Sequence, residues 1–126
     1  MSNTGRNLKE IDKLLRIASG LEETEFQRNS HYKKFKAKKI VNRNEFDRII
    51  RGLDDLKFRH ECIYWNEKIL KENVCTKDEH YEVLNNLCHA YFDIHEYDIA
   101  IEYGKKALAI IKVAKSTKSY KVVTNN

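Results

Sequence analysis

The stretch of residues 81–111 (YEVLNNLCHAYFDIHEYDIAIEYGKKALAII) constrains the fold of this chain more than any other. Apolar residues recur in it at steps of three and four, which places their side chains on one face of an α-helix. In the first half they are Leu84, Leu87, Cys88 and Tyr91; in the second half they are Tyr97, Ala100, Ile101, Gly104, Ala107, Leu108 and Ile111. Only residues 93–96 separate the two patterns, so the sequence predicts two helices that fold back antiparallel.

This pattern resembles a tetratricopeptide repeat (TPR), a helix-turn-helix unit of about 34 residues. The apolar residues of the first half fall on packing positions of its helix A. Four residues of the second half match its helix B, where small side chains let another helix approach closely: Tyr97, Ala100, Ala107 and Leu108. The resemblance covers about a quarter of the chain and implies an all-α fold.

Three residues depart from the family pattern. His95 replaces the glycine of the turn, and at positive φ a histidine is tolerated better than a β-branched residue. Gly104 replaces a larger packing residue. No proline follows the unit, because the chain contains none. We therefore expect helix B to continue past the usual stop, toward Ala114.

Residues 44–74 read as a degenerate copy of the same unit. Four apolar residues fall on the packing positions of helix A: Phe46, Ile49, Ile50 and Leu53. Cys62 then corresponds to Ala100, which gives a period of 38 residues. Arg59 and Asn66 stand where the pattern has bulky or aromatic residues. An alternative register makes residues 46–56 a helix B, but it breaks the A–B alternation leading into the clear unit.

The first third of the chain is predicted as a third hairpin, over residues 7–41. Its first helix has the stripe Leu8, Ile11, Leu14, Leu15 and Ala18 and stops near Gly20. Residues 22–41 are expected to be helical, although lysines interrupt the stripe. The fold prediction is an α-α superhelix, a TPR-like solenoid of about three antiparallel hairpins over residues 7–114. Residues 1–6 would be a flexible start, and residues 115–126 a polar tail, either a partial cap or disordered.

Composition narrows the class of protein. A length of 126 residues suits one domain, and 34% charged residues with 4 Gly and no Pro favour helices. The sequence has no apolar run long enough to cross a membrane, and polar residues follow Met1. An odd count of 3 Cys without a secretory signal indicates reduced thiols and a cytoplasmic location.

Neither catalysis nor metal binding is expected. Cys62, Cys75 and Cys88 are 13 residues apart, whereas zinc ligands normally come in close pairs. Cys88 and His89 are neighbours on a helix, so their side chains point in different directions. No glycine-rich phosphate loop is present. We expect no enzyme activity, no metal and no cofactor.

A basic run between His31 and Arg43 supports one alternative. It holds six basic residues and no acid, with Tyr32 and Phe35 between them: Lys33, Lys34, Lys36, Lys38, Lys39 and Arg43. Such a stripe could neutralise the phosphates of a nucleic acid. The ordinary interpretation is a solvated helix face in a lysine-rich protein, which the mild net charge of +5 favours.

The resemblance also implies a binding groove, because helix A lines the concave side of such solenoids. The polar positions of the two units give the candidate partner-binding residues: Asp47, Arg48, Arg51, Asp54, Glu82, Asn85, Asn86, His89, Phe92 and Asp93. Asn86 matches an asparagine that hydrogen-bonds the backbone of bound peptides in many relatives, and an amide offers both a donor and an acceptor. Arg48 and Arg51 could clamp a carboxylate.

The function predicted from the sequence is binding of another protein or peptide, in this groove or on an end face. The phrasing of residues 96–110 is similar to the sensor domains of Gram-positive peptide-pheromone receptors, which points to an adaptor or regulatory role. Residues 1–41 lack a DNA-reading helix-turn-helix. The alternatives are a nucleic-acid binder and a structural subunit of a homo-oligomer, which a charge on the last helix, such as Ala107→Glu, should break.

Overall fold

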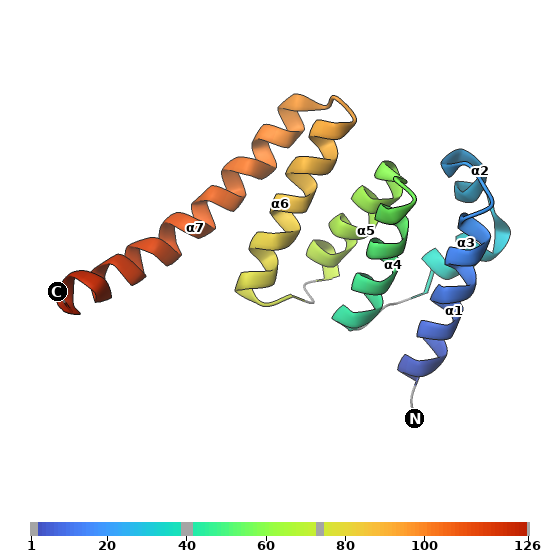
Figure 1. Ribbon diagram of the computed structural model, residues 1–126, viewed down its shortest axis with the longest axis horizontal. Coiled ribbons are helices and arrows are strands. Elements are labelled where there is room, and N and C mark those ends of the chain that lie inside the picture. The colour runs from blue at the N-terminus through green and yellow to red at the C-terminus, as the bar shows by residue number, and fades with distance from the viewer. Residues whose placement is uncertain (1–2, 39–41, 73–74, 126) are drawn as a thin grey trace. The chain divides into compact units, whose positions relative to one another are not determined.

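The computed structural model describes residues 3–38, 42–72 and 75–125, and their side chains over 7–38, 42–72 and 75–113. Every regular element in these residues is a helix, which confirms the all-α prediction. The helices are α1 (Asn3–Ala18), α2 (Glu23–Gln27), α3 (Ser30–Lys36), α4 (Arg43–Asp55), α5 (Arg59–Glu72), α6 (Lys77–Asp93) and α7 (Tyr97–Asn125) (Figure 1). They form two compact units, unit 1 (Met1–Val74) and unit 2 (Cys75–Asn126).

Unit 1 has its core where the apolar stripes of its helices meet. Helix α1 packs against α4, and α4 packs against α5. Most of the predicted packing positions are buried on α1 and α4, whereas Leu8, Leu15 and Ile50 are half-buried. The buried residues on these helices include Ile11, Leu14, Ala18, Phe46, Ile49, Leu53, Cys62, Trp65 and Ile69.

Gly52 lets α1 approach α4 closely. A Cβ atom built at Gly52 would lie 2.4 Å from Cδ1 of Leu15, which is well inside van der Waals contact. Any larger residue at position 52 would therefore force Leu15 to move. The contact explains how the predicted α1 stripe reaches the second helix of the core.

Of the segment 22–41, which the sequence predicts to be helical, the described residues 22–38 form two short helices, α2 and α3. Asn29 breaks it: the backbone there is extended, with φ −64° and ψ 129°, and the side chain accepts a 3.0 Å hydrogen bond from the backbone N–H of Tyr32. That is an N-cap, which starts a new helix instead of continuing the old one. Of the predicted stripe, Tyr32 and Phe35 are buried, whereas Ile40 and Val41 lie outside the described residues.

Two three-residue turns close the helical hairpins α4–α5 and α6–α7. In the first, Lys57 has φ 62°, and in the second His95 has φ 66°, so the residue that replaces the glycine of the family's turn has a left-handed backbone. Phe58 N–H donates to Leu53 O at 3.0 Å, and Glu96 N–H donates to Tyr91 O at 2.9 Å. This is the helix-ending bond pattern of a Schellman motif. Lys57 and His95 are 38 residues apart, the period expected from Cys62 and Ala100.

Unit 2 is the antiparallel hairpin α6–α7 (Figure 1). Thr76 starts α6 with a capping box, in which its side chain accepts from Glu79 N–H and Glu79 accepts from Thr76 N–H. Helix α6 ends at Asp93 and α7 begins at Tyr97, so the connection is residues 94–96, one residue shorter than the predicted 93–96. Helix α7 continues through Asn125, well beyond Ala114. The side chains of the predicted tail cap, Tyr120, Val122 and Val123, lie outside the described ones.

Candidate interaction surface

Large apolar side chains are exposed on unit 2. Among the side chains that the structure describes, the large apolar ones with high exposure all belong to α6 and α7. They are Phe92 (60% exposed), Tyr97 (46%), Ile99 (40%), Ile101 (54%), Leu108 (56%) and Val113 (69%). An exposed apolar group on a small protein is a recognised mark of an interaction site.

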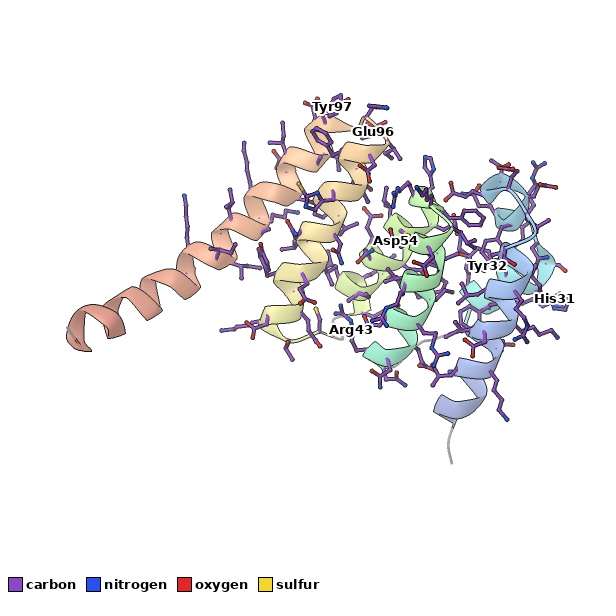
Figure 2. All side chains as sticks on the ribbon, in the orientation of Figure 1. His31, Tyr32, Arg43, Asp54, Glu96 and Tyr97 are labelled. Atoms are coloured by element: carbon purple, nitrogen blue, oxygen red, sulfur yellow. The ribbon has the colours of Figure 1, made fainter. Side chains whose placement is uncertain are left out.

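Four of these side chains share one side of the hairpin. Tyr97, Ile101 and Leu108 are separated by four and seven residues, so they align along α7. Phe92 joins them from α6, because its ring lies edge-on to the Tyr97 ring with centroids 5.0 Å apart. Figure 2 shows Tyr97 at the start of α7, beside the turn residue Glu96.

Small side chains lie between the two helices on this side. A Cβ built at Gly104 would be 3.3 Å from Sγ of Cys88, so glycine is the residue that fits without displacing the thiol. We call the surface formed by Phe92, Tyr97, Ile101, Gly104 and Leu108 the α6–α7 face. A ridge of large side chains beside a low strip is a shape that accepts another helix.

Ala107, at which the sequence predicts that a charge would break an oligomer, is not on this face. Ala107 is 4% exposed and Ala100 1%, and the neighbouring Tyr103 stacks on Tyr91 of α6 with centroids 5.6 Å apart. Ala107→Glu would therefore place a charge in packed interior and disrupt the hairpin itself. Leu108, one position on, is the informative site.

The candidate residues in unit 1 are largely paired inside that unit. Arg48 donates to both carboxylate oxygens of Asp12, at 2.8 and 3.0 Å. Two of the others form ion pairs of 2.8 Å, Asp47 with Arg43 and Asp54 with Arg59. Arg51 is exposed. The carboxylate that Arg48 clamps is thus supplied by α1, a pairing over 36 residues that periodicity alone does not reveal.

The candidate residues in unit 2 lie on two sides of α6. Glu82, Asn86, His89 and Asp93 follow one another at steps of three and four and are exposed. Asn85 is half-buried, and Phe92 belongs to the α6–α7 face. Helix α6 therefore presents one polar face to solvent.

The sequence did not predict a buried polar cluster that surrounds Glu61 in unit 1. The Glu61 carboxylate is 5% exposed; it accepts hydrogen bonds from the Tyr32 hydroxyl and, at 2.8 Å, from Gln27 Nε2, and Lys36 Nζ lies 2.9 Å away. Trp65 Nε1 donates to the Tyr32 hydroxyl at 2.8 Å. Figure 2 shows Tyr32 directed toward the other helices of its unit, while His31 points outward.

Opposing effects set the charge state of this cluster. Burial raises the pKa of Glu61, but hydrogen bonds from Tyr32, Lys36 and Gln27 outweigh it, and the pKa is lowered from its ordinary value. Burial, and then the charge of Glu61, raises the pKa of Tyr32 far above its ordinary value. Glu61 is therefore ionised and Tyr32 protonated at neutral pH. The cluster ties α2 and α3 to α5 and serves the fold of unit 1.

Three residues of the basic run between His31 and Arg43 form ion pairs with acids of unit 1. Lys36 pairs with Glu61, Lys38 with Glu10, and Arg43 with Asp47. Lys33 and Lys34 are exposed on α3, and Lys39 lies outside the described residues. Half of the predicted stripe is thus neutralised by acids of the same chain, which leaves less charge for a phosphate backbone.

Comparison of the chain with protein-family models, with curated proteins and with solved structures finds no match. Its function must be argued from its own geometry.

Other features of the described residues offer little for chemistry. Two surface hollows of unit 1 have volumes of about 280 and 160 Å³, below the roughly 300–1,000 Å³ of small-molecule sites. Among the residues that the structure describes, no group of three His, Cys, Asp or Glu side chains is arranged to hold a metal. No helix formed by these residues is long and apolar enough to span a bilayer. Burial, with the charge of Asp54, raises the pKa of Cys62 to about 12, so this thiol is unreactive at neutral pH.

Glu45 is an unusual buried acid. It lies in the first turn of α4, is fully buried, and neither of its carboxylate oxygens has a hydrogen-bond partner in the structure. Its backbone N–H is bonded to the Asn42 side chain at 3.0 Å. A carboxylate at a helix N-terminus gains some stabilisation from the helix dipole, which offsets part of the cost of burial.

Proposed function

We propose that this chain is a non-enzymatic, TPR-like helical module that binds a helical segment of another polypeptide on the α6–α7 face. The observation that carries the proposal is the exposure of Phe92, Tyr97, Ile101 and Leu108 along one side of a two-helix unit. Transfer of such side chains from water into a contact is favourable by about 25 cal/mol per Å² of apolar surface.

The TPR-like character of the proposal is supported by the two turns. Lys57 and His95 have the same left-handed backbone, the same preceding helix-ending bonds and the expected spacing of 38 residues. Two hairpins built on one plan are the elements of a solenoid, in which each hairpin offers a face to the next. The α6–α7 face is such a surface, exposed in this chain.

The shape and composition of the face favour a helix as the ligand. The side chains Tyr97, Ile101 and Leu108 form a ridge in line with α7, and Gly104 and Cys88 form the low strip beside it. A helix that lays an apolar stripe along this strip would cover both. An extended peptide is less suited, since the neighbouring backbone is helical and has no free strand edge.

The polar face of α6 is the competing location for a protein ligand. Its residues Asn86 and His89 are exposed. In unit 1, however, three of the four residues predicted to bind a partner already form ion pairs: Asp47, Arg48 and Asp54. A ligand on those residues of unit 1 would have to replace the ion pairs or use Arg51 alone. The apolar face needs no such exchange, so we assign the ligand to it.

Selection from a library of amphipathic helical peptides tests the assignment. We expect peptides that bind with micromolar dissociation constants by fluorescence anisotropy, and at least a tenfold loss of affinity in Leu108→Glu. Ile99→Glu is the matched control, because Ile99 is also exposed on α7 but lies off the face. Peptides that lose affinity with Arg51→Ala or Asn86→Ala and not with Leu108→Glu would place the ligand on the polar helix face and contradict the assignment.

A further inference from the structure

The α6–α7 face follows a coiled-coil seam along α7. Tyr97, Ile101, Gly104, Leu108 and Ile111 are spaced four, three, four and three residues apart, the alternation that keeps side chains facing a partner helix. The three larger members nearest the start of the helix are about half exposed. Gly104 is at the middle of the seam, where it allows a second backbone to come close.

Charged residues flank the seam on one side, and the sign of the charge changes along α7. Asp98, Lys105 and Lys112 are seven residues apart, so they line the same edge of the seam. All three are exposed. The acid is near the start of α7 and the two bases come after it. In a parallel pair of such helices this edge would lie beside the opposite edge of the partner, where Ala100 and Ala107 carry no charge, so the three charges would meet no opposite charge.

An antiparallel pair reverses that relation. With a two-fold axis near positions 104 and 105, Ile101 comes beside Leu108 of the other copy and Asp98 comes beside Lys112 of the other copy. The symmetry makes each of these contacts twice. The two Lys105 side chains meet near the axis, but both are exposed, where repulsion between single charges is weak.

We propose that the occupant of the α6–α7 face is a second copy of this chain, held as an antiparallel, two-fold dimer of α7 against α7. The inference rests on the proposed function and names its partner. The charge order along the seam selects this partner, because the chain is complementary to itself only in the reversed direction. Such an interface uses the same face of both copies and closes at two chains.

A charge-swap experiment tests the dimer. The wild-type chain should sediment as a dimer at micromolar concentration. Asp98→Lys or Lys112→Asp alone turns two attractive pairs into two repulsive ones, and we expect each to raise the dimer dissociation constant about tenfold. An equimolar mixture of the two variants should recover wild-type affinity, and so should the double variant, because both restore opposite charges across the seam.

Two control variants separate the seam from general effects. Leu108→Glu should give a monomer at every accessible concentration, whereas Ile99→Glu should remain dimeric, with helicity by circular dichroism unchanged in both. Asp55→Lys makes the same charge change as Asp98→Lys on an exposed residue of unit 1 and should leave the dissociation constant unchanged.

Each contrary outcome has a distinct meaning. A monomeric wild-type chain that still binds selected peptides through Leu108 overturns the dimer and leaves the proposed function standing. A dimer that the charge swaps and Leu108→Glu do not affect also overturns the inference, since it uses another surface. A monomer that binds no helical peptide overturns both. Single charge variants that dimerise as tightly as wild type, with Leu108→Glu monomeric, would show that Asp98 and Lys112 do not meet and would contradict the antiparallel arrangement.

Discussion

At the scale of single residues, Glu61 carries the most consequence for stability. Its carboxylate is buried, yet three side chains from α2 and α3 keep it ionised: Gln27, Tyr32 and Lys36. Removing one of these three partners leaves the buried Glu61 charge with fewer hydrogen bonds, which costs about 1–3 kcal/mol. Sequence patterns could not reveal the cluster, because Tyr32 and Glu61 are 29 residues apart and a glutamate on a helix normally faces water.

The lowered pKa of Glu61 predicts a loss of stability in acid. Because the folded pKa lies below the ordinary value of 4.5, the unfolded chain takes up the proton first. The stabilisation by ionised Glu61 is therefore complete above about pH 4.5 and is lost as the pH falls through the folded pKa. Glu61→Gln should be less stable than wild type at pH 7 by about 2 kcal/mol and should lose less stability on acidification. Urea unfolding of both proteins from pH 7 to pH 3 measures this, and parallel pH profiles would contradict it.

At the scale of elements, the sequence predicted the bounds of the helices that have a clear stripe better than those of the helices whose stripe is interrupted. The α6–α7 hairpin and the place of its turn followed from the spacing of apolar residues around residues 93–96. The division of residues 23–36 into α2 and α3 did not, because it depends on one local hydrogen bond from the backbone N–H of Tyr32 to the Asn29 side chain. Nor did the length of α7, whose C-terminal part has no apolar stripe to follow.

The strained turns make a prediction about glycine. A residue with a side chain pays about 1 kcal/mol for left-handed backbone, whereas glycine adopts it freely. His95→Gly should therefore be more stable than His95→Ala by about 1 kcal/mol, since both variants equally lose the hydrogen bond between the imidazole and the Tyr97 hydroxyl. The pair Lys57→Gly and Lys57→Ala should differ in the same direction. Thermal unfolding gives the comparison, and an alanine variant as stable as its glycine counterpart would argue against a left-handed turn.

At the scale of the whole molecule, unit 1 and unit 2 differ in how completely they bury their apolar groups. In unit 1 the helices surround Trp65, Tyr32 and Phe26, all fully buried, and the basic run is paired with acids of the same unit. Within unit 2, the two helices bury apolar side chains where they face each other, and Phe92, Ile101 and Leu108 remain exposed. The sequence predicted a protein-binding role with ten candidate residues, of which only Phe92 is on the face that we assign. Spacing identifies a helix stripe, but which side of it stays uncovered depends on packing.

Photo-crosslinking from the α6–α7 face tests the central claim most directly. Benzoylphenylalanine at position 101 should crosslink the purified chain to a second copy, or to a selected helical peptide when one is added. The same group at position 99, exposed on α7 but off the face, should give no such product. Crosslinking from position 99 and none from position 101, with either partner, would show that the ligand lies elsewhere and would contradict the account.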